Sequence, residues 1–204
     1  VMLDNPDCIF SFHSVNVVDI EGKYLYEYNN NVNGSALYLD NIAANLLRHR
    51  CFICTNSLMI NAKLAADIKH RTDVGIGNDW MLVVELANNG KCIYIPKALG
   101  TYRRHNANIS KNIKISHEEN VYNYILKRYP CYRGDIQCGL VQLYTMYIFK
   151  YLLRANVKMT LYCLVKLVMS LYKDPRNIFI VIRKISNEFH KRIYLFKVTG
   201  SLER

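Results

Sequence analysis

Residues 79–96 read DWMLVVELAN, NG and KCIYIP in succession, which is the pattern of a helix, a break and a strand. The apolar residues of the first part recur at three- and four-residue intervals, as on the buried face of a helix. Asn89-Gly90 is a typical signal for the end of such a helix, and Pro96 stops the strand that follows. A helix joined directly to a strand is a building unit of layered α/β domains.

Strands and helices alternate on both sides of this run. Residues 8–18 alternate apolar and polar side chains and predict a half-buried strand, and the helical apolar pattern of residues 37–50 ends on cations that suit a helix C-terminus. We also expect an extended piece at 98–104, a strand at 51–60 interrupted at 55–57, one or two helical turns at 61–67, and a loop at 28–35. The predicted fold class is therefore α/β.

After residue 116 every stretch has helical spacing. We expect helices at 117–128, 135–153, 157–172 and 176–192, with the breaks supplied by Pro130, Asn156 and Asp174-Pro175. Asp174 followed by Pro175 is an N-cap with proline at the first helical position. The chain should thus divide into an α/β part, residues 1–115, and a basic, amphipathic helical extension, residues 116–204.

Composition excludes several classes of protein. The chain has 204 residues, of which 51% are hydrophobic and 21% charged, so it can bury a core and is neither disordered, collagen-like nor a coiled coil. Seven cysteines, an odd number in a chain of this size, argue against a disulfide framework and favour a reducing compartment. The first residues lack the basic and apolar regions of a signal peptide, and we interpret Val1 as a start made by cutting.

Positive charge is concentrated in the C-terminal quarter. Residues 150–204 hold twelve Lys and Arg against three acids, a balance of +9 within the total of +11. Such a segment can bind the phosphates of a nucleic acid or the anionic headgroups of a membrane, and its charge alone does not distinguish the two partners. The basic helices lack a recognisable base-reading motif, so no nucleic-acid partner is expected.

The hydrophobic runs favour a peripheral rather than a spanning relation to membranes. The longest uncharged run, residues 136–149, has fourteen residues and is too short to cross a bilayer. On the helix at 157–172 and its flanks, Lys158, Lys166 and Lys173 occupy an arc of about 80° and apolar residues fill most of the rest. This face suits a membrane interface, and the alternative is that it packs on the α/β part or on a neighbouring helix.

Gly77-Asn78-Asp79-Trp80 places a carboxylate at the start of a buried helix after a glycine turn. Free backbone N–H groups and the positive helix end favour the ionised form of Asp79, which suits it as a general base for a bound hydroxyl. The alternative is that Asn78 or Asp79 only caps the helix, a common role for both residue types.

Tyr102-Arg103-Arg104-His105 joins an extended piece to a polar loop. The guanidiniums of Arg103 and Arg104 can bind a diphosphate, and the neutral imidazole of His105 can ligate a divalent cation. Strand alternation would send Arg103 and His105 to the same side. The alternative is an exposed basic turn with a solvated histidine.

Other candidate groups favour structural roles. Cys51-x-x-Cys54 has the spacing of metal or redox pairs, but no second pair follows at a suitable distance, which favours buried thiols. His13 lies inside a strand and is interpreted as a core histidine.

Taken in order, five segments resemble the second half of the family 2 glycosyltransferases, which have the GT-A, or nucleotide-diphospho-sugar transferase-like, fold. Residues 5–22 look like the stretch after that family's acidic metal motif, 52–59 like the strand before the acceptor site, 77–80 like the catalytic-base motif, and 90–96 and 102–105 like the closing strands and terminal histidine. The likeness runs from residue 3 to 110, about half of the chain.

The resemblance implies an inverting sugar transfer from a nucleotide-diphosphate donor to a glycan or lipid-linked acceptor. Asp79 would be the base, while Arg103 or Arg104 would neutralise the leaving diphosphate. His105 would help bind a divalent ion, Mg or Mn. Ser57, Asn78 and Trp80 would contribute to substrate binding, with Trp80 as a wall of the acceptor pocket.

The chain departs from the family in two ways. Asn78 stands where many members have Glu, which leaves Asp79 as the sole candidate base. Residues 1–78 supply neither the nucleotide-binding units nor the acidic metal motif of the family's N-terminal half. We therefore expect a transferase fragment that is inactive alone, cytoplasmic or peripheral at the inner face of the cell membrane. The alternative is a non-catalytic scaffold whose basic helices bind a membrane surface or a partner protein.

Overall fold

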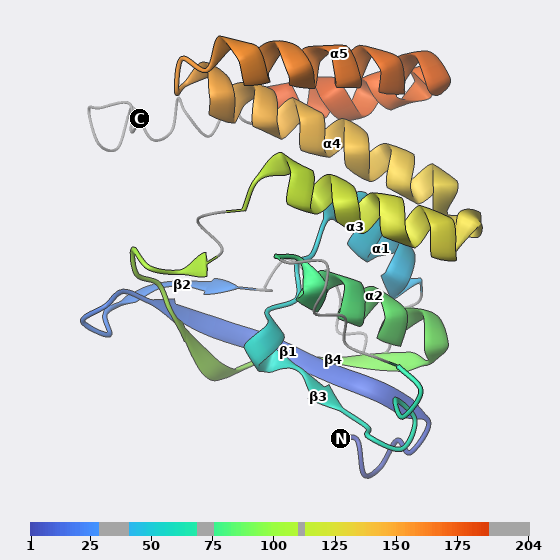
Figure 1. Cartoon of the computed structure of the whole chain (residues 1–204). Helices are drawn as coiled ribbons and strands as arrows, with labels where there is room; N and C mark the ends of the chain where they lie inside the picture. The colour runs from blue at the N-terminus through green and yellow to red at the C-terminus, as the bar shows by residue number, and fades with distance from the viewer. Residues whose placement is uncertain (29–40, 69–75, 110–112, 188–204) are drawn as a thin grey trace. The chain divides into compact units, whose positions relative to one another are not determined.

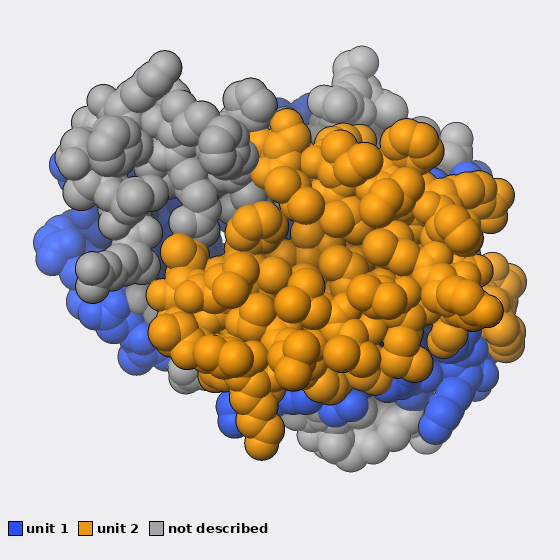
Figure 2. Space-filling model, turned by 90° about the horizontal axis from the view of Figure 1, so that it is seen from above, with its two compact units in different colours: residues 1–128 blue, residues 129–204 orange. Residues whose placement is uncertain are grey.

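The computed structural model (Figure 1) forms two compact units, residues 1–128 and 129–204, which Figure 2 colours separately. It describes residues 1–28, 41–68, 76–109 and 113–187. The first unit includes the helix at 115–128, whereas the expected division at 115/116 falls just after the first residue of that helix. Each unit is described by itself below.

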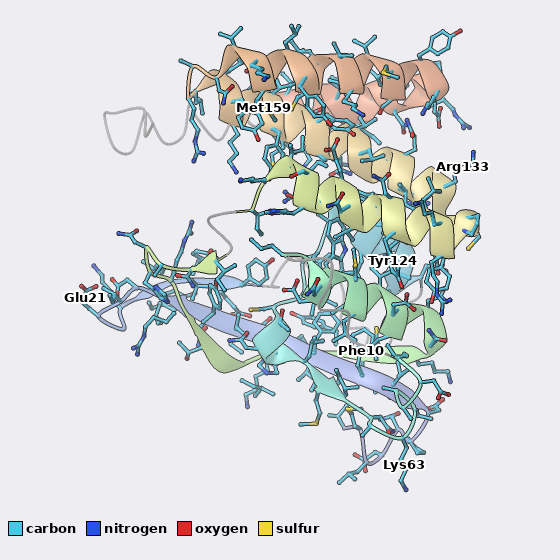
Figure 3. The ribbon with its side chains drawn as sticks, viewed as in Figure 1. Phe10, Glu21, Lys63, Tyr124, Arg133 and Met159 are labelled. Carbon is cyan, nitrogen blue, oxygen red and sulfur yellow. The ribbon has the colours of Figure 1, made fainter. Side chains whose placement is uncertain are left out.

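The first unit is built around the strand β1 (Cys8–Val18), whose predicted bounds are confirmed. The expected half-burial is wrong, because nine of its eleven residues are buried and both faces of this central strand are covered. One edge of β1 pairs in parallel with β4 (Lys91–Arg103). Its other edge is shared by two antiparallel strands, β2 (Tyr24–Tyr28) near the end of β1 and β3 (Met59–Ile60) near its start. The sheet is therefore mixed, and the parallel pairing brings the C-terminal ends of β1 and β4 to the same edge. Glu21, labelled in Figure 3, marks the turn between β1 and β2.

Three helices lie over this sheet (Figure 1): α1 (Ile42–His49), α2 (Asn78–Asn89) and α3 (Ile115–Arg128). α2 contacts β1, and both α1 and α3 contact α2. At the contact between α2 and α3 the rings of Trp80 and Tyr122 meet edge to face, with centroids 5.0 Å apart. The mixed α/β class predicted from the sequence is confirmed, because helices and strands share one apolar core.

Proline does not end the strand at residue 96, contrary to the sequence-based prediction. β4 runs without interruption from Lys91 to Arg103, and its partner on β1 changes from His13 to Ser14 while β4 advances from Ile95 to Ala98. The two extra residues, Pro96 and Lys97, form a bulge, where the missing N–H of proline removes no ladder hydrogen bond.

Residues 51–67 also differ from the prediction. Cys51 to Cys54 are not in a strand, residues 55–57 form the 3-10 turn η1 (Thr55–Ser57), and only Met59–Ile60 pairs with β1. Residues 62–67 form turns without a regular helix. Of the loop expected at 28–35, Tyr28 belongs to β2, and the rest lies outside the described residues, as do 37–40 and 188–192.

Gly90 joins α2 to β4 because no side chain fits there. A Cβ at this position would lie 2.8 Å from the Cβ of Ile9, a residue of β1 that is 1% exposed. We expect Gly90→Ala to lower the free energy of unfolding by about 1–3 kcal/mol through overpacking, measured by urea denaturation. Gly134→Ala is the matched control, because its Cβ would meet open space. Equal stabilities of the two variants would contradict this account.

The second unit is helical, as predicted. It contains η3 (Pro130–Tyr132), α4 (Arg133–Leu152), α5 (Val157–Lys173), η4 (Pro175–Asn177) and a helix over residues 178–187. α4 packs against α5, and Gln137 Nε2 donates to the carbonyl of Ser170 at 2.7 Å. The predicted N-cap is confirmed, since Asp174 accepts from the backbone N–H of Arg176. Within the described ranges, no helix is both long enough and apolar enough to cross a membrane.

Candidate functional site

Asp79 lies in the first turn of α2 with its side chain exposed. Gly77, at φ 115°, turns the chain into the helix, and no side chain caps it. One carboxylate oxygen of Asp79, Oδ1, accepts from the backbone N–H of Trp80 at 2.8 Å. The other, Oδ2, accepts from the Thr55 hydroxyl at 2.9 Å. The carboxylate is thus held at the surface from two directions.

η1 supplies the second element of the site. Thr55 on this turn reaches Asp79, and its neighbour Asn56 donates through Nδ2 to the carbonyl of Thr101 at 3.4 Å. η1 therefore connects the start of α2 with the last residues of β4. Ser57, expected to bind substrate, is 2% exposed, and its hydroxyl donates to the Cys54 carbonyl at 2.7 Å. Thr55 and Asn56 were not among the predicted site residues.

The basic segment follows directly after Thr101. Arg103 and Arg104 are exposed, and Nη1 of Arg104 lies 3.5 Å from the hydroxyl of Tyr26 on β2. The backbone N–H of Arg104 donates to the carbonyl of Val18, which holds this segment to the end of β1. β4 ends at Arg103, so strand alternation does not extend to His105.

Asn108 closes the turn that carries His105. Its Oδ1 accepts from the backbone N–H of His105, and its Nδ2 donates to the Tyr102 hydroxyl at 3.1 Å and to the Arg103 carbonyl at 3.2 Å. The side-chain amide of Asn108 thus makes hydrogen bonds to three residues of the segment 102–105 and stabilises its backbone conformation. Only the polar character of the loop at 105–114 hinted at this role of Asn108.

Asn78 and Trp80 point away from the exposed carboxylate. Trp80 is 4% exposed and packs on Tyr122, so it lies in the core and not at the surface. Asn78 Oδ1 is buried, and neither this atom nor Trp80 Nε1 has a hydrogen-bond partner among the described residues. The position of both residues beside Asp79 in the sequence therefore does not bring their side chains beside it in space.

The thiols of Cys51 and Cys54 lie near Asp79, and the phenol of Tyr28 lies near these two thiols. Burial raises the pKa of Cys51 to about 12, and the charge of Asp79 adds in the same direction. Burial also raises the pKa of the Cys54 thiol, whose Sγ donates to Asn56 Oδ1 at 2.7 Å. Tyr28 on β2 has a pKa of about 12, raised by burial and then by Cys51 and Cys54. Both cysteines form no disulfide and are uncharged at neutral pH, but they are only partly buried and lie outside any strand, so the prediction of buried thiols is not met in full.

These raised pKa values make the first unit sensitive to alkali. A thiol that ionises near pH 9.0 when unfolded and near 12 when folded favours the folded protein below pH 9, and this preference is lost as the pH rises. We expect the free energy of unfolding to fall by about 1.4 kcal/mol per pH unit above pH 9 from Cys51 alone. Cys51→Ser should flatten this slope in urea titrations, whereas Cys131→Ser, at an exposed thiol, should not.

A metal site is not completed by the part of the chain that the structure describes. In residues 1–28, 41–68, 76–109 and 113–187, no three His, Cys, Asp or Glu side chains converge on one point. His105, the predicted ligand, would be a single donor, and stable Mg or Mn sites need several oxygen-rich ligands. The described residues alone therefore do not fit the predicted divalent ion.

The described geometry brings Asp79 together with Thr55, and places the turn that carries Thr55 against the end of β4, from which Arg103, Arg104 and His105 follow. The chain matches no protein-family model, and neither a curated protein nor a solved structure shows significant similarity to it.

Proposed function

We propose that this chain is the acceptor-side half of a family 2-type glycosyltransferase, in which Asp79 removes the proton from an acceptor hydroxyl. The observation that carries the proposal is the exposed carboxylate of Asp79, held by Thr55 and by the backbone of Trp80. The order of motifs noted in the sequence, from residue 3 to 110, supports the same class of reaction.

Asp79 retains the capacity to act as a base. An ionised carboxylate offers about four acceptor positions, and two are used, one by the Thr55 hydroxyl and one by the Trp80 N–H. The remaining lone pairs are available to an incoming hydroxyl. Because both bonds orient the carboxylate before substrate arrives, little reorganisation is needed at the moment of proton transfer.

Arg103 and Arg104 would bind the departing nucleoside diphosphate through hydrogen bonds and opposite charge. In the proposed step a bond forms between the acceptor oxygen and the anomeric carbon while the bond from that carbon to the donor phosphate breaks. The acceptor proton goes to Asp79, and the electron pair leaves with the nucleoside diphosphate. Exposed guanidiniums suit this product because their paired N–H groups match phosphate oxygens. No step is assigned to a metal, since His105 alone does not hold one.

A transfer assay tests the proposal. The chain is assayed within the longer polypeptide that its cell produces, because the 204 residues alone are expected to be inactive. This polypeptide is incubated with a panel of radiolabelled nucleotide-diphosphate sugars and with glycan and lipid acceptors. We expect release of nucleoside diphosphate together with a labelled acceptor. Arg103→Gln with Arg104→Gln should weaken donor use by about tenfold or more, since each charge-assisted hydrogen bond contributes on the order of 1.5–3 kcal/mol. Arg133→Gln, an exposed arginine of α4, is the control. Absence of transfer with every donor would overturn the proposal.

A further inference from the structure

α5 exposes most of its large apolar side chains, and two of the four residues that it buries are small and polar. The residues that it buries in the second unit are Thr160, Cys163, Leu167 and Ser170. Six exposed residues, 42–89% exposed, form what we call the α5 stripe: Val157, Leu161, Leu164, Val165, Val168 and Tyr172. At 100° per residue these six positions fall within an arc of about 100°. A helix that buries threonine and serine while exposing leucine and valine has its apolar face directed away from its own unit.

The α5 stripe is a contiguous row of exposed apolar side chains along one side of the helix. Isolated exposed apolar residues are ordinary, but a contiguous row marks an interaction site. Val157 and Tyr172 lie at its two ends, and at 1.5 Å per residue they are about 22 Å apart along the axis. In the next helix, residues 178–187, Ile178, Ile182 and Ile185 are also exposed, and they too lie three and four residues apart.

Positive charge borders the stripe on one side. Lys158, Lys166 and Lys173 follow it around the helix, and α5 contains no acidic residue. Lys166 Nζ lies over the ring of Tyr162 at 5.5 Å from its centroid, so aromatic and cationic groups meet at this border. The nearest acid in sequence, Asp174, is already paired with Arg176 at 2.9 Å. No carboxylate of α5 therefore opposes an anionic surface.

We propose that the α5 stripe docks on the headgroup region of an anionic lipid bilayer. The aliphatic stripe would enter the boundary between headgroups and acyl chains, while the bordering lysines reach the lipid phosphates. Charge complementarity favours this occupant over an apolar protein groove, since residues 150–204 carry twelve basic residues against three acids. The docking is independent of the transferase proposal, because it uses none of the residues around Asp79.

Vesicle co-sedimentation of the full chain tests the docking. We expect binding to vesicles of phosphatidylcholine mixed with phosphatidylglycerol, weaker binding to phosphatidylcholine alone, and partial release by salt. Leu161→Ser with Val165→Ser and Val168→Ser should lower the partition coefficient by tenfold or more. Lys158→Gln and Lys173→Gln should each lower it by about fivefold on the anionic vesicles only. The matched control is Leu3→Ser with Ile20→Ser and Leu64→Ser, three exposed apolar residues of the first unit.

A second measurement locates the contact. The only tryptophan of the chain, Trp80, is buried, so Leu161→Trp adds a reporter on the stripe. Its fluorescence should be quenched by brominated lipids, whereas that of Ile20→Trp should not. Binding that persists in the triple α5 variant, or a Leu161→Trp signal unaffected by brominated lipids, would overturn the proposal. So would an absence of vesicle binding, including the case in which sedimentation equilibrium shows that the stripe joins two copies of the chain.

Discussion

Asp79→Asn is expected to lower kcat for sugar transfer by about 10²–10⁴-fold, the contribution of a positioned general base. Asparagine keeps the size of the side chain: its Oδ1 can still accept from the backbone N–H of Trp80, while its Nδ2 can only donate to the Thr55 hydroxyl oxygen. It cannot take a proton from the acceptor. The measurement is kcat and KM with saturating donor, and KM for the acceptor should change little because the shape of the site is retained.

Two variants of Thr55 test its hydrogen bond to Asp79 separately from the role of Asp79 as the base. Thr55→Val removes one hydrogen bond to Asp79 and should shift the pH profile of kcat, whereas Thr55→Ser should restore it. Asp67→Asn, at another exposed aspartate of the first unit, is the control for loss of a surface charge. Full activity of Asp79→Asn would refute its assignment as the base, while leaving the transfer reaction itself to be judged by the donor assay.

Glu118→Gln is expected to lower the free energy of unfolding by about 3 kcal/mol. Glu118 on α3 has a side chain that is 7% exposed, and its two oxygens accept from Arg50 Nε at 2.6 Å and Nη2 at 2.7 Å. Neutralising one partner leaves the other charge poorly compensated in a half-buried place. Urea denaturation, followed by the fluorescence of Trp80 beside α3, measures the change.

The backbone of Arg50 adds to this effect. Arg50 ends α1 at φ 67° and ψ 176°, a region that costs a non-glycine residue about 1–3 kcal/mol and persists only where the surroundings enforce it. The bidentate contact with Glu118 holds Arg50 in this conformation.

The double variant Arg50→Met with Glu118→Met should recover part of the loss in unfolding free energy, since it leaves no unpaired charge. Asp7→Asn, which breaks the exposed pair with Lys91, should leave the unfolding midpoint unchanged. A loss in Asp7→Asn as large as in Glu118→Gln would contradict the account.

The elements with strong local patterns were predictable from the sequence. β1 and α2 carry clear periodicity over eleven and twelve residues, and the N-cap at Asp174 is local chemistry. Asn156 was expected only as a break, and the structure shows that it also caps α5 by accepting from the backbone N–H of Met159. β2 was missed because its five residues, YLYEY, gain their strand conformation from pairing with β1. The prediction that the strand ends at Pro96 was wrong for a similar reason. The bulge that accommodates this proline is visible only in the register between β4 and β1.

Of the candidate site, only the residues marked by their immediate sequence neighbours could be predicted. Asp79 could be identified because a carboxylate that follows a glycine turn at the start of a helix is a signal within a few residues of sequence. Thr55 and Asn56 were not, because their contacts reach 24 and 45 residues along the chain. Trp80 was expected at the pocket from its neighbour in sequence, but the helix turns its side chain by about 100° from that of Asp79 and into the core.

The parallel partnership of β1 and β4 leaves one edge of the central strand without its partner early in synthesis. Asp7 and Lys91, which are paired where the two strands begin, are 84 residues apart, so β4 reaches this edge of β1 only after the intervening residues have been made. An apolar edge left open for that time invites pairing with other nascent chains. Slow translation or scarce chaperones should therefore reduce the yield of this protein more than loss of any single surface contact.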